Sequence, residues 1–250
     1  MRKILSTMRR AIEDYNMIED GDKIAIGVSG GKDSLVLLKA FWHLKMFYPK
    51  KFDMVAITLD LGYVENDYTP IMELCKELEI EYKVIDTNIK EVVFDIRNEK
   101  NPCALCAKLR GGALHNAAID EGCNKVCLGH HFDDVIETFF LSLFYEGRIN
   151  CFSPVNFLDR KKITLIRPFI YTTEREIRGA CKRNNLPVCK NPCPADGNTK
   201  RQEMKDFVAE KFLHDKGFKD RIFNAVCTSG IEGWKKEGRK LRVTDKKADE

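Results

Sequence analysis

The sequence feature that most constrains the fold is a short apolar run that ends in Ser-Gly-Gly-Lys-Asp-Ser. Residues 23–28 have the β-branched apolar pattern of a buried strand, and an apolar helical pattern begins at Leu35. In the loop between them, Gly30 and Gly31 allow backbone N–H groups to converge on an anion beside the positive end of a helix. The pattern therefore predicts a strand, a phosphate-binding loop and a helix, with a ligand-free turn of the same shape as the alternative.

The spacing of this loop excludes two common nucleotide-binding motifs. A mononucleotide P-loop requires Gly-x-x-x-x-Gly-Lys-Ser/Thr, and a dinucleotide site requires Gly-x-Gly-x-x-Gly. The loop instead resembles the pyrophosphate loop, or PP-loop, of N-type ATP pyrophosphatases through Ser29, Gly30, Gly31, Lys32, Asp33 and Ser34. This resemblance implies cleavage of ATP between its α- and β-phosphates, with transfer of AMP to a substrate oxygen.

Length and composition indicate one α/β domain with a small appendix. The chain has 250 residues, 44% of them hydrophobic and 32% charged, and its net charge of +4 indicates no class of partner by itself. No apolar run approaches the roughly 20 residues that span a bilayer, and the basic N-terminal residues belong to an amphipathic helical pattern. We therefore expect a cytoplasmic protein. Ten cysteines without a secretory signal favour metal or redox chemistry over a disulfide framework.

Strand-like and helix-like segments alternate along most of the chain. Apolar strand patterns are expected at 23–28, 52–60, 82–85, 125–129 and 163–166, and a long loop at 147–162. Parallel neighbours need crossover helices, so the alternation predicts an α/β fold. We expect a Rossmann-like parallel sheet with helices on both faces, followed by C-terminal helices.

The domain organisation is predicted from shifts in composition. The expected parts are an N-terminal helix at 1–20, an ATP-binding α/β domain at 21–185, a cysteine loop with C-terminal helices at 186–231, and a charged, flexible tail at 232–250.

Two pairs of cysteines stand apart from the others. Cys103 and Cys106 form a Cys-x-x-Cys pair at the start of a predicted helix, where one turn brings both sulfurs to one side. Zinc, an iron–sulfur cluster or a redox disulfide fits such a pair, although no thioredoxin-like context is present. Cys189 and Cys193 form a looser Cys-x-x-x-Cys pair in a loop. The remaining six are expected to be ordinary buried residues.

Five motifs together resemble the tRNA 2-thiolation branch of PP-loop proteins. They are the loop at 29–34, Cys103 and Cys106 followed by 108–111, the run 129–141, Arg167-Pro168, and Pro192-Cys193. The greatest similarity is to the TtcA family, which makes 2-thiocytidine in the anticodon loop of tRNA, and it extends from about residue 20 to 205. The resemblance implies an adenine nucleotide α hydrolase-like fold and modification of cytidine 32.

The same resemblance implies cofactors and partners. They are ATP, Mg²⁺, a [4Fe–4S] cluster, tRNA and a sulfur donor, either a cysteine desulfurase or sulfide, and a homodimer is a possible assembly. By position, the cluster ligands are Cys103, Cys106 and Cys193. The third cysteine of the family usually stands in Cys-x-x-Cys, so Cys189 is an alternative ligand here. The sister family that thiolates a uridine has zinc ribbons at both ends, which this sequence lacks.

The proposed chemistry assigns roles to the nucleotide-binding residues. The PP-loop would bind the departing pyrophosphate, and Lys32 would offset its charge. Asp33 would cap the helix or hold Mg²⁺. At the end of the second strand, Asp60 would contact the ribose or a metal, with plain strand termination as its alternative. The adenine would lie against backbone near Ile57, and the nucleotide would approach closely at Gly129 and His130.

Three further residues are catalytic candidates. One of Asp133 and Asp134 would serve as metal ligand or acid/base, and the alternative is N-capping of a helix. Arg110, one turn beyond Cys106, would face the cluster and the activated base, and the alternative is a surface arginine.

Basic segments are the expected contacts with tRNA phosphates, although a solvated face is the alternative for each. They are Lys108 with Arg110, 160–162, 182–183, 200–201 and 235–247. Two other functions remain open. One is a different PP-loop adenylating enzyme that thiolates uridine, makes lysidine or amidates a small molecule. The other is a zinc-stabilised module that binds nucleotide or tRNA without turnover.

Overall fold

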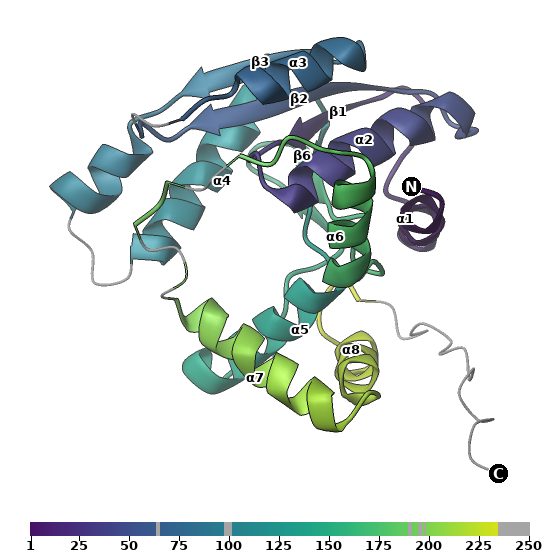
Figure 1. Ribbon diagram of the computed structural model, residues 1–250, viewed down its shortest axis with the longest axis vertical. Helices are drawn as coiled ribbons and strands as arrows, with labels where there is room; N and C mark the ends of the chain where they lie inside the picture. The colour runs from purple at the N-terminus through teal and green to yellow at the C-terminus, as the bar shows by residue number, and fades with distance from the viewer. Residues whose placement is uncertain (64–65, 98–101, 190–191, 195–196, 198, 235–250) are drawn as a thin grey trace. The chain divides into compact units, whose positions relative to one another are not determined.

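Six strands of the computed structural model form one sheet in the order β3-β2-β1-β4-β6-β5 (Figure 1). The structure describes residues 1–63, 66–97, 102–189, 192–194, 197 and 199–234. The strands are β1 (Asp22–Gly27), β2 (Phe52–Asp60), β3 (Glu81–Asp86), β4 (Lys125–Cys127), β5 (Val155–Leu158) and β6 (Ile163–Ile166).

All neighbouring strands pair in parallel except β5 and β6. The last residue of β1, Gly27, lies opposite Ile57 of β2, and Ile26 lies opposite Cys127 of β4. The loops that follow these three strands therefore emerge at one edge of the sheet. The predicted parallel α/β fold is confirmed. The predicted loop at 147–162 is wrong in part, because Val155–Leu158 pairs with β6 as a short edge strand that its sequence pattern does not reveal.

Helices pack on both faces of this sheet. Their bounds are α1 (Arg2–Asp14), α2 (Lys32–Phe47), α3 (Thr69–Glu77), a π-helix (Glu91–Ile96), α4 (Pro102–Asp120) and α6 (Glu174–Arg183). Leu114 and Ala118 of α4 pack in one core cluster with Ala25 of β1. Side chains alternate along a strand, so the buried Ile24 and Ile26 face the opposite side, where α2 contacts β1 and lies beside α6.

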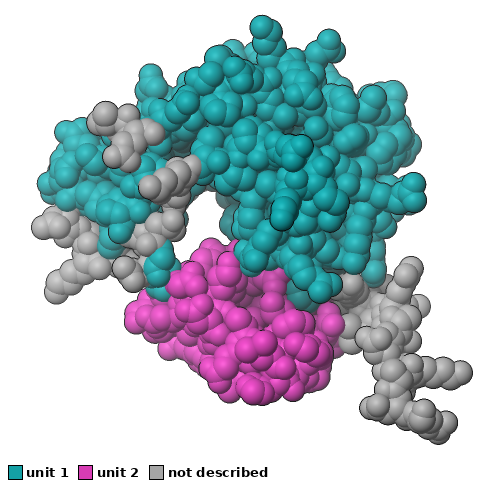
Figure 2. All heavy atoms as spheres, in the orientation of Figure 1, with its two compact units in different colours: residues 1–132, 154–199 teal, residues 133–153, 200–250 magenta. Residues whose placement is uncertain are grey.

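The chain divides into two compact units, coloured separately in Figure 2. Unit 1 comprises Met1–Phe132 and Pro154–Thr199, and unit 2 comprises Asp133–Ser153 and Lys200–Glu250. This division differs from the sequence-based boundaries at residues 20, 185 and 231, because α1 packs with α2 and α6 in unit 1. Among the described helices, none is long and apolar enough to cross a bilayer.

Aromatic side chains form the contacts between the helices of unit 2. Its helices are α5 (Phe132–Leu141, whose first residue belongs to unit 1), a π-helix (Ser142–Glu146), α7 (Lys200–His214) and α8 (Phe218–Thr228). The ring of Phe140 lies 5.3 Å from that of Phe207 and 6.0 Å from that of Phe218. These contacts join α5 to both C-terminal helices.

The predicted start of the flexible tail, at 232, is wrong. Trp234 is 6% exposed, its indole Nε1–H donates to the carbonyl of Phe152 at 3.0 Å, and its ring meets that of Phe223 edge-on. Trp234 alone, after charged and glycine residues, thus extends the packed region from residue 231 to residue 234. The rest of the predicted tail, 235–250, lies outside the described residues.

A buried ion pair joins the starts of β1 and β4. Lys125 Nζ lies 2.7 Å from Asp22 Oδ2, and the two side chains are 9% and 3% exposed. The Asp22 carboxylate also accepts hydrogen bonds from Glu19 N and Asn124 Nδ2, while Lys125 donates to the carbonyl of Met17. Each charge therefore has its counter-ion and at least one further hydrogen bond, as a stable buried pair requires.

We expect Lys125→Met to destabilise the protein by about 3–5 kcal/mol, since it leaves the Asp22 carboxylate buried without its cation. The loss is measured as the free energy of unfolding in urea. Adding Asp22→Asn should recover part of the loss, because the double variant buries no charge. A single variant within about 1 kcal/mol of the parent would contradict this account of the pair.

Candidate functional site

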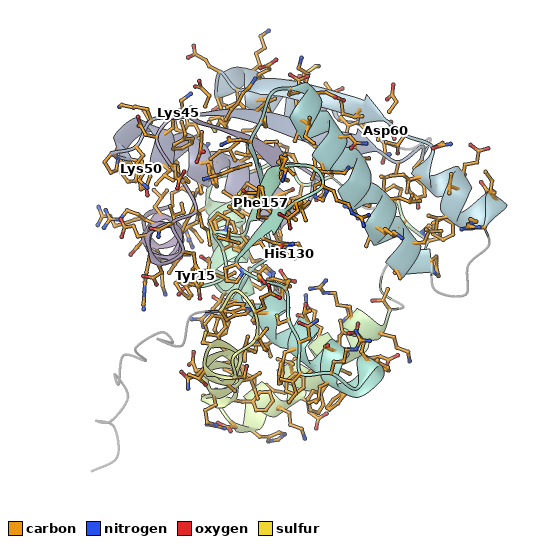
Figure 3. All side chains as sticks on the ribbon, turned by 180° about the vertical axis from the view of Figure 1, so that it is seen from behind. Tyr15, Lys45, Lys50, Asp60, His130 and Phe157 are labelled. Carbon is orange, nitrogen blue, oxygen red and sulfur yellow. The ribbon has the colours of Figure 1, made fainter. Side chains whose placement is uncertain are left out.

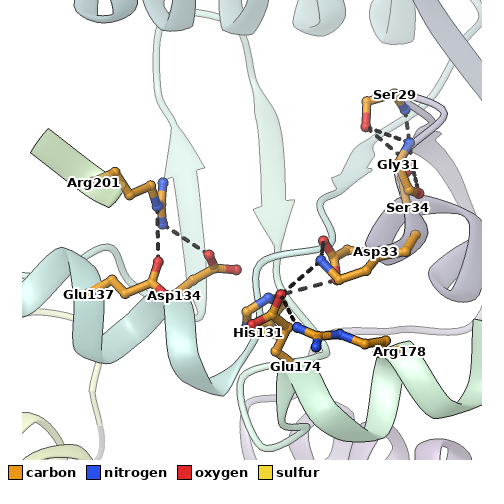
Figure 4. Close-up of polar contacts among 11 residues, drawn as sticks. Ser29, Gly31, Asp33, Ser34, His131, Asp134, Glu137, Glu174, Arg178 and Arg201 are labelled. Atoms are coloured by element: carbon orange, nitrogen blue, oxygen red, sulfur yellow. Dashed lines mark hydrogen bonds and ion pairs between the residues drawn. The ribbon is translucent and has the colours of Figure 1, made fainter. Parts of the chain in front are cut away.

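The loop after β1 is held in shape by its own serines (Figure 4). Ser34 Oγ donates to the carbonyl of Gly31 at 2.9 Å and accepts from the backbone N–H of Ser29 at 3.2 Å. Gly31 donates its N–H to Ser29 Oγ at 3.4 Å. Gly30 has φ of +79°, a conformation that glycine adopts without strain. The loop thus has a preformed shape at the N-terminus of α2.

Two glycines allow other segments to approach this loop closely. A Cβ at Gly30 would lie 3.0 Å from Cys189 Cβ, and the N–H of Cys189 donates to the carbonyl of Gly30 at 3.0 Å. A Cβ at Gly129, which follows β4, would lie 3.3 Å from the carbonyl carbon of Asp33. The segment that carries Cys189 therefore lies against the PP-loop.

Lys32 is paired with two carboxylates. Its Nζ lies 3.0 Å from Asp33 Oδ2 and 3.1 Å from Glu174 Oε1. Burial lowers the pKa of Lys32, but Asp33 and Glu174 outweigh it and raise this pKa above its usual value. Lys32 is therefore a cation at neutral pH. Glu174 was not predicted from the sequence; its one signal is its place next to Thr173, the N-cap of α6.

Asp33 does not cap α2 as predicted. The N-cap is Gly31, and α2 has no side-chain cap. Asp33 Oδ1 is buried, accepts no hydrogen bond from the described residues, and lies 3.8 Å from Nε2 of the buried His131. A cation or a hydrogen-bond donor would therefore satisfy this oxygen.

Asp60 and His130 come from different strand ends of unit 1 and are labelled in Figure 3. Asp60 Oδ1 accepts from Gly62 N at 2.9 Å and from Asn66 Nδ2 at 3.2 Å. Burial, followed by the nearby Asp60, raises the pKa of Tyr68 to about 12. The Asp60 carboxylate is therefore hydrogen-bonded within the turn after β2.

The carbonyl of Ile57 also has a partner, since it accepts a hydrogen bond from Val28 N at 2.8 Å.

The carboxylates at the start of α5 form ion pairs within unit 2. Asp133 Oδ1 lies 2.6 Å from Lys219 Nζ, and Asp134 Oδ1 lies 3.1 Å from Arg201 Nη2. Arg201 also contacts Glu137, as Figure 4 shows. Burial and then Asp134 raise the pKa of Glu137. The ion pairs of Asp133 and Asp134 therefore connect α5 to α8 and to α7, respectively.

The first turn of α4 brings the cysteine pair near the third candidate. The Cys106 thiol interacts electrostatically with Cys103 and Cys193 and is hydrogen-bonded to Arg110. Burial raises the pKa of the Cys106 thiol, and Arg110 offsets part of that rise. The structure thus places Cys193, together with Arg110, in the electrostatic surroundings of Cys106. The Cys189 thiol instead donates to the carbonyls of Asp67 and Pro187.

Tyr63 joins this group and was missed in the sequence. Its phenol is hydrogen-bonded to Cys193 and also interacts with Cys106 and Arg110. Burial, followed by Cys193, raises the pKa of Tyr63, so the neutral phenol can donate to the sulfur. A tyrosine after Gly62 carries no sequence signal for such a contact.

The donor set fits an iron–sulfur cluster in its chemistry. Cys103, Cys106 and Cys193 offer three thiols, and three thiolates leave one iron without a protein ligand. In the part of the chain that the structure describes, no three His, Cys, Asp or Glu side chains are grouped to hold a metal ion.

Comparison with known proteins shows the family to which the chain is related. Residues 3–212 match the model of the PP-loop domain. The chain is 36% identical over 229 residues to a tRNA-cytidine(32) 2-sulfurtransferase of Geobacter metallireducens, covering 90% of this chain and 89% of that protein. It is 37% identical over 233 residues to the protein of the same name in Pseudomonas entomophila, with 90% and 84% covered. These relatives confirm the resemblance to the TtcA family.

A solved structure confirms the fold. The U34-tRNA thiolase NcsA from Methanococcus maripaludis, determined with its [4Fe–4S] cluster, superposes with a TM-score of 0.73 at 24% identity, covering 91% of this chain and 79% of that one. The chain therefore belongs to the PP-loop family and, within it, to the tRNA-cytidine(32) 2-sulfurtransferases.

Proposed function

We propose that this protein is an ATP-dependent tRNA thiolase that replaces the C2 oxygen of cytidine 32 with sulfur. The observation that carries the proposal is the serine-braced loop at the carboxyl end of β1, in a chain with more than a third of its aligned residues identical to sulfurtransferases of that name. The C2 oxygen is a poor leaving group, so it attacks the α-phosphorus of ATP and pyrophosphate departs. Sulfide, as HS⁻, then adds to C2 and loses its proton, and AMP leaves with the oxygen.

The PP-loop binds the pyrophosphate in this proposal. Its N–H groups and the hydroxyls of Ser29 and Ser34 donate to phosphate oxygens, and Lys32 offsets their charge. The buried Oδ1 of Asp33 supports a second role for that residue as a Mg²⁺ ligand. Ile57, Asp60, Gly129 and His130 remain the candidate surroundings of the nucleoside, although the hydrogen bonds of Asp60 also suit its alternative as a strand terminator.

Cys103, Cys106 and Cys193 would hold a [4Fe–4S] cluster. When bound, such a cluster offers an iron without a protein ligand, which can accept inorganic sulfur. Arg110 lies against Cys106 and would orient the activated base beside it. The ion pairs of Asp133 and Asp134 support the structural alternative for both residues over acid/base catalysis.

Partners and setting follow from this chemistry. We infer that tRNA is the substrate, that a cysteine desulfurase or sulfide supplies the sulfur, and that the protein acts in the cytoplasm. A homodimer is a possible assembly. Splaying an unpaired base out of the anticodon loop gives access to its C2 oxygen, which pairing within a duplex would prevent.

The function is tested by incubating anaerobically prepared protein with ATP, sulfide and unmodified tRNA. We expect pyrophosphate release that depends on tRNA, and 2-thiocytidine at position 32 by mass spectrometry. Lys32→Ala should lower pyrophosphate release at least about 100-fold, since it removes the cation that stabilises the developing charge. Its iron content should equal that of the parent. A colourless protein that releases pyrophosphate with a small molecule, or a zinc protein without turnover, would refute the proposal.

Serine substitutions distinguish the cysteines. We expect Cys103→Ser, Cys106→Ser and Cys193→Ser each to lose iron and thiolation, because two thiolates hold a cluster poorly. Cys189→Ser is the matched control, since its sulfur contacts carbonyls instead, and it should keep both. Iron and sulfide analysis after anaerobic purification provides the measurement. The reverse pattern for Cys189 and Cys193 would assign the third ligand to Cys189.

Tyr63→Phe removes the phenol hydroxyl that is hydrogen-bonded to Cys193 and keeps the aromatic ring. We expect iron to be lost to a chelator about 10-fold more readily, as for other groups that support a metal ligand. Tyr68→Phe is the control, because Tyr68 interacts with Asp60. Equal iron retention in the two variants would show that the phenol does not stabilise Cys193.

A further inference from the structure

Glu174 provides the second carboxylate that binds Lys32. Its side chain is 13% exposed, and its Oε1 lies 3.1 Å from Lys32 Nζ. A pair this sheltered is screened less by salt than a surface pair. Asp33, the other partner, is adjacent to Lys32 in the chain and moves with the loop, whereas Glu174 belongs to a different helix.

The start of α6 fixes the position of Glu174. Thr173 caps the helix and forms a reciprocal capping box with Glu176, so the backbone at Glu174 is well defined. Helix α6 lies beside α2, whose first residue is Lys32. Glu174 therefore presents its carboxylate to the PP-loop from a rigid element.

A second cation uses the same oxygen of Glu174. Arg178 Nη2 lies 3.2 Å from Oε1, one helical turn along α6 (Figure 4). The arginine side chain is 69% exposed, so its pairing is the weaker of the two. Lys32 and Arg178 thus share one acceptor oxygen and compete for it.

These contacts oppose the binding of phosphate by Lys32. A polyphosphate that needs the ammonium group has to draw it away from Glu174, and the cost of opening that pair reduces the observed affinity. The pair can re-form when the anion leaves. The raised pKa of Lys32 agrees with a cation that is stabilised before any phosphate binds.

We propose that Glu174 is a positioning residue that restrains Lys32 and thereby weakens the hold of the PP-loop on pyrophosphate. The inference rests on the proposed function, in which this loop binds the pyrophosphate of ATP. Its consequence is release of a product that would otherwise remain bound to a strongly cationic loop.

The test measures the Kd of inorganic pyrophosphate by titration calorimetry on the full chain. We expect Glu174→Gln to tighten binding about fivefold, because Lys32 no longer has to leave a charged partner. Arg178→Gln should weaken binding about twofold, since it leaves Glu174 to Lys32. Opposite signs from two neighbouring residues would not arise from a general loss of structure, and equal melting temperatures would verify the fold.

A double variant decides whether Glu174 acts through Lys32. Glu174→Gln should have no effect on the Kd in a Lys32→Ala background. The same gain in both backgrounds would mean that Glu174 merely repels the anion, and would overturn the proposal, as would a Glu174→Gln variant with unchanged or weaker binding. If the parent protein binds neither pyrophosphate nor ATP, the proposed function fails instead.

Discussion

The parallel pairing of β1 with β2 on one side and β4 on the other is the constraint on which the rest of the structure depends. Each ladder directs a carboxyl end to the same edge of the sheet, so the PP-loop after β1, Asp60 at the end of β2 and His130 after β4 belong to the ends of three adjacent strands. Ligands of open α/β sheets bind at such an edge. The buried pair of Asp22 and Lys125 joins the opposite ends of β1 and β4.

Charge at this edge is arranged in pairs rather than as an open basic surface. Lys32 contacts Asp33 and Glu174, and Arg110 contacts Cys106. A cation with a protein partner has to leave that partner before it can bind a phosphate, so each pair lowers the affinity of the cation for the ligand. The same pairing makes affinity sensitive to neighbours that never touch the ligand.

Local patterns in the sequence were sufficient to predict much of the fold and part of the candidate site. The PP-loop and the pair Cys103 and Cys106 have fixed spacings, because each belongs to one turn or one loop. Tyr63 and Glu174 could not be found this way, since their importance comes from contacts with residues far along the chain. Trp234 and β5 were missed because one aromatic residue and a four-residue strand are too short to establish a period.

The hydrogen bond between Cys189 and Gly30 limits how far Cys193 can lie from the PP-loop. The backbone of Cys189 is hydrogen-bonded to the PP-loop, and Cys193 follows it by four residues. Four residues of fully extended chain span at most about 14 Å. While that hydrogen bond persists, Cys193 therefore has to lie within that reach of the residue that contacts the PP-loop. The PP-loop and Cys193 are thus linked through a short segment of chain, so a substitution that breaks the hydrogen bond of Cys189 should also change where Cys193 can lie.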